Sequence, residues 1–322
     1  EKINSWDEKA VNLDFDETGR AAAYTLENNL YLALEGKQVT VTREENKGIV
    51  YGSERVHRNE WGISKGTFWS PDGKKIAFYR MDESMVSEYP LVDASARIAT
   101  VNPTRYPMAG MASHRVSLGI YHPASGKTLY LEPDSLRISD PSLRFEYLTN
   151  ITWSPDGKHI YVAALNRDQN HMQLNQYDAA SGRYIRTLFE EKDTAYVEPL
   201  QGPKFFGDDP DRFIWESRRD GFNHLYLYES SGKMVKQITG GPWEVTGFTG
   251  ADPQGDMAWF LGNTGNPLER HIYSVDIRKG AVKQLSSAPG THSARVSDDG
   301  RYILDTYSSV TVPRQTDLLD AN

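Results

Sequence analysis

The chain has 322 residues, no cysteine and a formal net charge of −8 at pH 7. The acidic balance argues against a nucleic-acid binder, which needs a basic face, and the lack of cysteine excludes disulfides and thiolate metal ligands. No apolar run is long enough to span a membrane. The chain starts at Glu1 without a basic and apolar leader, so we expect that a signal segment has been removed or that a longer chain has been cut.

A tight Asp-Gly turn followed by an alternating apolar run is the first repeated element. Its clearest copies are residues 69–73 and 153–157, which both read Trp-Ser-Pro-Asp-Gly. Pro suits the first corner of such a turn, and Gly supplies the positive φ at its end. The alternation after each turn predicts a half-buried strand. Weaker copies lie at 16–19, 208–211, 252–255 and 298–300.

A second class of turn alternates with the first along the chain. Each copy centres on a glycine and separates two short strands, and the copies lie at 35–37, 125–127, 181–183, 231–233 and 279–281. The unit is therefore strand, Asp-Gly turn, strand, link, strand, second turn, strand. Four strands per unit, with first turns roughly 45 to 55 residues apart, are typical of propeller blades. We predict an all-β protein, a β-propeller with four-stranded antiparallel blades, over residues 1–322.

One unit is longer than the others. The two turns are 25 residues apart between Gly157 and Gly182 but 53 apart between Gly73 and Gly126. The excess of roughly 30 residues predicts an insertion at 82–113. Its prolines and glycine indicate an ordered but irregular excursion. Such excursions often carry function, although this one could equally pack against a neighbouring blade.

Residues 51–63 form the other unusual stretch, charged where a regular blade would have a plain strand and turn. They precede a blade's innermost strand, which would place Glu60 near the central channel of a propeller. A solvated surface glutamate is the alternative interpretation.

Several short motifs suggest chemistry that their context does not support. Residues 62–66 match the G-x-S-x-G nucleophile elbow, but Ser64 precedes a strand and a turn, whereas the elbow needs a strand-to-helix turn. Residues 14–19 resemble the start of a calcium loop, yet Thr25 occupies the twelfth position, where a glutamate belongs. The histidines are scattered and no phosphate-binding loop is present, so we predict no metal and no cofactor.

An ordered set of segments resembles the propeller, the N-terminal region, of the dipeptidyl peptidase IV family of serine peptidases, in the prolyl oligopeptidase clan. The resemblance covers nearly the whole chain, and the insertion falls in the matching unit. The segments are 69–73, 76–80, 82–84, 106–110, 221–226, 239–245 and 305–310.

The resemblance implies a larger enzyme around this chain. The family's eight-bladed propeller, most of which this chain would cover, caps a C-terminal α/β-hydrolase domain of the same polypeptide that carries the Ser-Asp-His triad. The chain stops where that domain would begin, so no catalytic residue is expected in it. The implied activity is release of Xaa-Pro or Xaa-Ala dipeptides from peptide N-termini, in a periplasmic or secreted enzyme that can form a homodimer.

In that family the propeller presents two glutamates that bind the substrate's α-amine. The matching window here reads His-Arg-Asn-Glu over 57–60, so the resemblance assigns substrate N-terminus binding to Glu60 with Asn59 in place of the second glutamate. This departure leaves open a tripeptidyl-type relative with a single anchoring glutamate. A non-enzymatic periplasmic propeller scaffold also stays open, as does an endopeptidase whose propeller filters substrate size. A second G-x-S-x-G beyond Asn322 would distinguish an enzyme from a scaffold.

Overall fold

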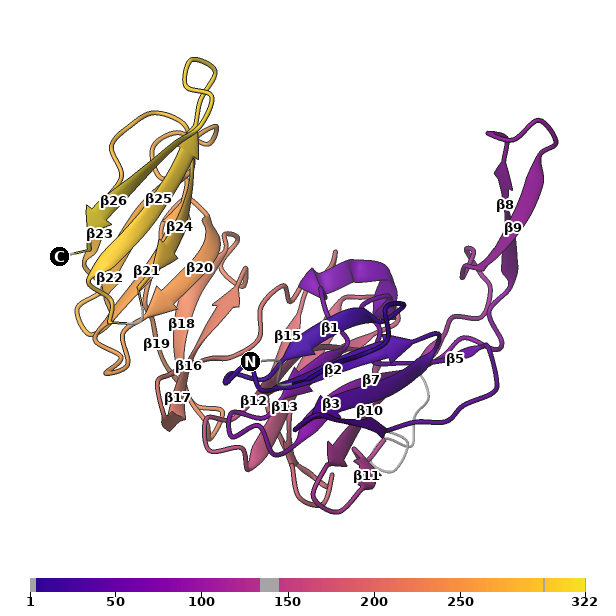
Figure 1. Cartoon of the computed structure of the whole chain (residues 1–322). Coiled ribbons are helices and arrows are strands. Elements are labelled where there is room, and N and C mark those ends of the chain that lie inside the picture. The colour runs from indigo at the N-terminus through magenta and orange to yellow at the C-terminus, as the bar shows by residue number, and fades with distance from the viewer. Residues whose placement is uncertain (1–3, 134–144, 298, 322) are drawn as a thin grey trace. The chain divides into compact units, whose positions relative to one another are not determined.

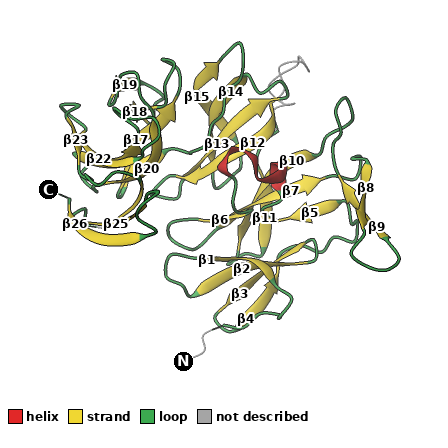
Figure 2. Ribbon diagram, turned by 90° about the horizontal axis from the view of Figure 1, so that it is seen from above, coloured by secondary structure: helices red, strands yellow, loops and turns green. Residues whose placement is uncertain are grey.

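The computed structural model describes residues 4–133, 145–297 and 299–321, and nearly all of its regular structure is β-strand (Figures 1 and 2). The chain divides into two compact units, the first comprising 1–153, 157–186 and 192–200, and the second 154–156, 187–191 and 201–322. The sheets follow one another along the chain as antiparallel blades. The prediction of an all-β propeller with four-stranded antiparallel blades is confirmed. No helix among the described residues is long and apolar enough to cross a membrane.

The first three sheets follow the predicted unit, with one irregular member. The first has the order β1-β2-β3-β4 and the third β12-β13-β14-β15. In the second, β11-β10-β7-β5, an additional strand β6 also pairs with β7. The strands are β1 (Val11–Phe15), β2 (Ala21–Leu26), β3 (Asn29–Leu34), β4 (Lys37–Thr40), β5 (Ile49–Tyr51), β6 (Thr67–Trp69), β7 (Ile76–Asp82), β10 (Arg115–His122), β11 (Lys127–Tyr130), β12 (Phe145–Trp153), β13 (His159–Asn166), β14 (His171–Asp178) and β15 (Tyr184–Lys192).

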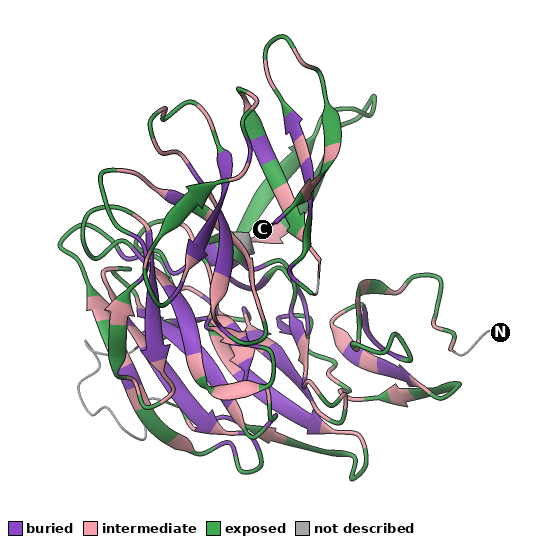
Figure 3. Cartoon of the chain, turned by 90° about the vertical axis from the view of Figure 1, so that its left-hand side faces the viewer, coloured by how far each residue is buried: buried purple, intermediate pink, exposed green. Residues whose placement is uncertain are grey.

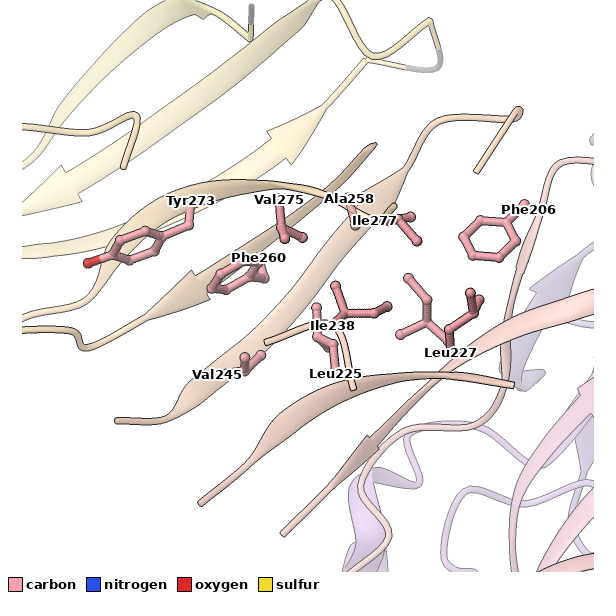
Figure 4. Close-up of a cluster of buried hydrophobic side chains, with 11 residues drawn as sticks. Phe206, Leu225, Leu227, Ile238, Val245, Ala258, Phe260, Tyr273, Val275 and Ile277 are labelled. Atoms are coloured by element: carbon pink, nitrogen blue, oxygen red, sulfur yellow. The ribbon is translucent and has the colours of Figure 1, made fainter. Parts of the chain in front are cut away.

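The remaining sheets have the orders β16-β17-β18-β19, β20-β21-β22-β23 and β24-β25-β26. Apolar side chains of the fourth and fifth sheets, among them Phe206, Leu225 and Phe260, form one buried cluster (Figure 4). Neighbouring blades are thus joined by a shared core, and burial is greatest in the middle strands (Figure 3). The strands are β16 (Lys204–Phe206), β17 (Asp209–Ser217), β18 (His224–Glu229), β19 (Met234–Gln237), β20 (Val245–Ala251), β21 (Met257–Gly262), β22 (His271–Asp276), β23 (Val282–Gln284), β24 (Thr291–Val296), β25 (Tyr302–Ser308) and β26 (Gln315–Asp320).

The Asp-Gly turns join the first and second strands of the blades, and a serine closes several of them. The Ser70 hydroxyl donates to the Asp72 carboxylate at 2.7 Å, and Ser154 and Asp156 repeat the bond at 2.6 Å. In the last sheet the hydrogen bond from the Ser297 hydroxyl, followed by one from a backbone N–H, lowers the pKa of Asp299. Residue 298 of that turn lies outside the described residues. The carboxylates of these Asp-Gly turns accept hydrogen bonds within their own turns.

The tryptophan of the Trp-Ser-Pro-Asp-Gly motif connects adjacent blades. The Trp69 indole N–H donates to the carbonyl of Asp14 in β1 at 3.1 Å, and the Trp153 indole N–H donates to the carbonyl of Phe68 in β6 at 2.9 Å. Each bond therefore runs from the first strand of one blade to the first strand of the blade before it. The motif specifies this contact as well as the turn.

Three of the third strands, β3, β18 and β22, are fixed by a side chain at their start. A later Thr or Ser hydroxyl accepts a hydrogen bond from the backbone N–H of the strand's second residue and bonds to the side chain of its first. This arrangement gives two of the scattered histidines a structural role. The pairs are Asn29 with Thr42, His224 with Thr239, and His271 with Ser286.

The segment between β7 and β10 contains a two-stranded ribbon, β8 (Glu88–Asp93) and β9 (Thr100–Arg105). The two strands pair only with each other, and Figure 1 shows them projecting from their sheet. The segment is not irregular throughout, as the sequence predicted, because β8 and β9 are regular strands. Pro90 and Pro103 lie opposite each other in register, and a two-stranded ribbon tolerates proline because each strand has an outer edge that needs no hydrogen-bonded neighbour.

Candidate functional site

The first strand of the second blade is interrupted. β5 pairs with the end of β7, where Tyr51 lies opposite Arg80, and β6 pairs with its start, where Thr67 lies opposite Phe78. The intervening residues 52–66 leave the sheet and contain the 3-10 helix η1 (Val56–Gly62), drawn in red in Figure 2. The charged stretch noticed in the sequence is therefore a segment extruded from the middle of a strand.

Two glycines bring the ends of this segment together. The Gly52 N–H donates to the Tyr79 carbonyl at 2.8 Å, and the Tyr79 N–H donates to the Gly66 carbonyl at 3.0 Å. A Cβ on Gly66 would lie 2.4 Å from the backbone of Gly52, too close for any side chain, and Gly52 has φ +60°. Both positions therefore require glycine. This close approach explains the last glycine of the G-x-S-x-G pattern.

The described side chains of the segment include both buried and exposed ones. Val56, His57, Trp61 and Ile63 are buried, whereas Glu60 is exposed. The apolar side chains attach the segment to the first unit and leave the carboxylate at its surface.

The backbone of η1 is strained at two of its buried residues. His57 has φ 52° and Trp61 has φ 53°, the left-handed region that non-glycine residues rarely adopt. Such conformations cost roughly 1–3 kcal/mol each and persist only when the surroundings impose them. The aromatic rings around His57 hold its strained backbone conformation in place. Trp61 lies 5.3 Å and Tyr147 5.1 Å from it between centroids, and Trp61 and Tyr147 are 4.8 Å apart.

The Glu60 side chain is exposed on η1. The structure gives this side chain no hydrogen bond or ion pair to any other described residue, and only its backbone carbonyl is used, accepting from the Ile63 N–H at 3.1 Å. The side chains of Arg58 and Asn59 lie outside the described part of the structure. The proposed partnership of Glu60 with Asn59 therefore remains a prediction.

A second contact joins the start of the extruded segment to the start of the insertion. Arg55 Nη2 lies 3.3 Å from Glu83 Oε1, and the Glu83 side chain is almost fully buried. Arg105 of β9 donates in turn to the carbonyls of Glu83 and Val86 at 3.3 and 2.9 Å. The segment that carries Glu60 and the base of the ribbon are thus connected through Glu83.

The other sequence candidates have structural surroundings. Ser64 is exposed in the loop between η1 and β6, and no strand-to-helix turn is present there. Asp14 bonds to the Thr67 hydroxyl at 2.8 Å, and Asp16 accepts the backbone N–H groups of its own turn. Among the described residues no group of three His, Asp or Glu side chains could hold a metal ion.

His57 is a residue of this site that the sequence reasoning did not assign. Its Nδ1 lies 2.9 Å from Nε2 of His114, which follows the insertion, and its Nε2 accepts the backbone N–H of Leu148 in β12 at 3.2 Å. His57 lies in the window 57–60, in which the family resemblance points to glutamates. Its partners are 57 and 91 residues away, and no local pattern indicates them.

Fold and sequence together define the class and then the family. The blades and their turns define a β-propeller domain, and 314 residues, 1–314, match the family model for the dipeptidyl peptidase IV (DPP IV) N-terminal region. The chain belongs to this family.

Solved structures and curated relatives agree with the assignment. The chain is 41% identical to a candidate dipeptidyl aminopeptidase IV from Bacteroides ovatus, with a TM-score of 0.86 over 98% of this chain and 45% of that one. It is 27% identical to Porphyromonas gingivalis dipeptidyl peptidase 4, with a TM-score of 0.87 over 99% of this chain and 45% of that one. Dipeptidyl-aminopeptidase B of Aspergillus niger is 28% identical over 92% of this chain. The chain spans 36% of the length of that relative.

Proposed function

We propose that this chain is the substrate-gating propeller of a serine-type dipeptidyl peptidase and that Glu60 binds the α-ammonium group of the peptide substrate. The observation that carries the proposal is the position of Glu60, an exposed carboxylate on a short helix extruded from a strand and held by buried rings. The names of the relatives, which are dipeptidyl peptidases, support it.

The chemistry follows from charge and distance. A carboxylate accepts charge-assisted hydrogen bonds from an ammonium group, and these are stronger than neutral ones. A carboxylate that binds the substrate's N-terminus at a fixed distance from a nucleophile in a C-terminal hydrolase domain would determine which peptide bond, counted from that N-terminus, is cleaved. That geometry would release Xaa-Pro or Xaa-Ala dipeptides, with Asn59 offering a further, uncharged acceptor. The proposal includes a periplasmic or secreted location, which the family resemblance implies and cell fractionation would test.

The test uses the full-length protein on a Xaa-Pro-Xaa peptide with a free amine and on its N-acetylated form. We expect dipeptide release from the first and at least 100-fold slower cleavage of the second, because acetylation removes the charge that Glu60 would bind. Mass spectrometry identifies the product. Tripeptide release would favour the single-glutamate relative, equal cleavage of both peptides would favour an endopeptidase, and no cleavage would favour a scaffold.

The ribbon β8–β9 is proposed to contact a second copy of the full-length protein. Every residue of β8 is exposed, including Tyr89, Leu91 and Val92, and a two-stranded ribbon is marginally stable without a partner. Two copies related by a two-fold axis could cover these apolar side chains on each other.

Replacing residues 88–105 by a short Gly-Ser turn should therefore shift the full-length protein from dimer to monomer in analytical ultracentrifugation. The triple substitution of Tyr89, Leu91 and Val92 by Ser provides a milder version that leaves the ribbon in place. A dimer that persists in both variants would show that this surface serves another partner.

A further inference from the structure

We propose that the hydrogen bond between His57 and His114 positions the Glu60 helix, and that it does so only while both imidazoles are neutral. The inference rests on the proposed function, because it concerns the placement of the carboxylate that would bind the substrate amine. It makes His57 and His114 positioning residues, since neither is argued to touch the substrate.

The contacts of His57 fix the positions of the protons. The Leu148 N–H can only donate, so Nε2 of His57, 3.2 Å away, must be the acceptor and carries no proton. The remaining proton of a neutral ring then lies on Nδ1, which donates to Nε2 of His114 at 2.9 Å. His114 must therefore present an unprotonated Nε2. A proton added to either of these acceptor nitrogens breaks one bond of this chain.

The described residues that surround His57 are aromatic rings. The groups that face His57 are Tyr79 from β7, Tyr147 from β12, Trp61 from η1 and His114 from the end of the insertion. None is an acid that ionises near neutral pH. Among the described residues, Arg167 donates to the Tyr147 hydroxyl and Glu146 also acts on that tyrosine, and Arg55 and Glu60 lie in His57's own segment.

Burial, followed by the charge of His114, holds the pKa of His57 well below its usual value. His57 is therefore neutral at and above neutral pH. As the pH falls through the ordinary histidine range, protonation becomes favourable in any state that releases the ring to water. Acid thus favours detachment of His57 from Leu148 and His114.

Detachment would reach Glu60 through the strained backbone. His57 and Trp61 both have positive φ, and Glu60, which carries the carboxylate, lies between them in the chain. When the hydrogen bonds of His57 are lost, so are the contacts that hold the strained backbone at the start of η1. Glu60 would then sample positions from which it cannot meet the substrate amine, which raises KM for free-amine peptides and leaves the hydrolytic step unchanged.

The experiment compares four variants of the full-length protein on the free-amine Xaa-Pro substrate. His57→Phe keeps a ring but removes both bonds, and His114→Leu removes the acceptor. His114→Gln can place an amide oxygen where Nε2 lies and should rescue function. His224→Gln is the matched control, because His224 is equally buried and hydrogen-bonded but its partners, Thr239 and Gly241, lie outside the extruded segment.

We expect His57→Phe and His114→Leu to raise KM about 10-fold with kcat changed less than about threefold. His114→Gln should stay within about threefold of the parent. The parent's KM should rise as the pH is lowered from about 7.5 to about 5.5, and His57→Phe should flatten that rise because its site is already loose. His224→Gln should lower the melting temperature without changing KM.

Two outcomes overturn the inference alone. One is an unchanged KM in His57→Phe and His114→Leu while Glu60→Ala, measured alongside, loses activity. The other is a KM change in His224→Gln as large as theirs, which would reflect general destabilisation. If Glu60→Ala retains full activity, the proposed function fails and the inference fails with it.

Discussion

Replacing Trp153 by Ala is expected to lower the free energy of unfolding by about 3–5 kcal/mol, the range for a large buried aromatic side chain. Trp153 is only 8% exposed, and its indole N–H donates to the Phe68 carbonyl at 2.9 Å. The Lys75 ammonium lies 5.4 Å from its ring centroid and donates to the Gly157 carbonyl at 2.6 Å. The substitution removes the packing and the hydrogen bond between blades at the same time.

Urea unfolding followed by far-UV circular dichroism measures this effect without relying on tryptophan fluorescence. Trp153→Phe should cost less, about 1–3 kcal/mol, because a ring remains while the partly buried Phe68 carbonyl loses its donor. Leu268→Ala is the control, since Leu268 is 89% exposed and such substitutions change stability by less than about 0.5 kcal/mol. A cost below about 1 kcal/mol for Trp153→Ala would show that the contact between blades is not stabilising.

The blade repeat could be predicted because each of its turns is a local signal. A turn such as 153–157 needs only its own five residues, and it correctly predicts a strand after it. The half-buried character expected from alternation is wrong, because β13 is buried over residues 160–165 on both faces. The bond from Trp153 to Phe68 crosses 85 residues, so no local pattern indicates it. The sequence therefore predicts the blades better than the contacts that join them.

The ribbon β8–β9 shows where turn-forming residues mislead. Pro90 and Pro103 suggested irregular structure, yet they pair in register because a ribbon has two outer edges. Proline has no backbone N–H to donate. It is therefore excluded from a central strand of a sheet but not from the outer edge of a two-stranded ribbon.

At the candidate site the sequence located the exposed residue and missed its support. Glu60 was selected because the resemblance points to its window, and the structure places it on η1. The interruption of the strand by 52–66 depends on two distant glycines that meet at Tyr79, and the bond of His57 to His114 spans the whole insertion. Both depend on chain segments that become neighbours only in the folded blade.

In the full-length protein, Glu60→Ala is expected to lower kcat/KM on a free-amine Xaa-Pro substrate roughly 30-fold to a few thousand-fold. Removing one partner of a hydrogen-bonded charge pair costs about 2–5 kcal/mol when the pair is shielded from water, and each 1.36 kcal/mol corresponds to a factor of ten. A solvated glutamate that touches no substrate would change the rate by much less, since exposed ion pairs contribute at most about 1 kcal/mol.

Two further variants distinguish the effect of the Glu60 charge from the effect of the side chain's shape and from that of any change at the surface. Glu60→Gln keeps the size and a hydrogen-bond acceptor but removes the charge, so most of the loss should already appear there. Glu54→Ala is the matched control, because Glu54 is an exposed glutamate in the same extruded segment and is not assigned to the amine. The N-acetylated substrate, which lacks the ammonium, should be cleaved equally slowly by the parent and by Glu60→Ala. A loss below about threefold for Glu60→Ala on the free-amine substrate would make Glu60 an ordinary surface residue and remove the basis for an exopeptidase.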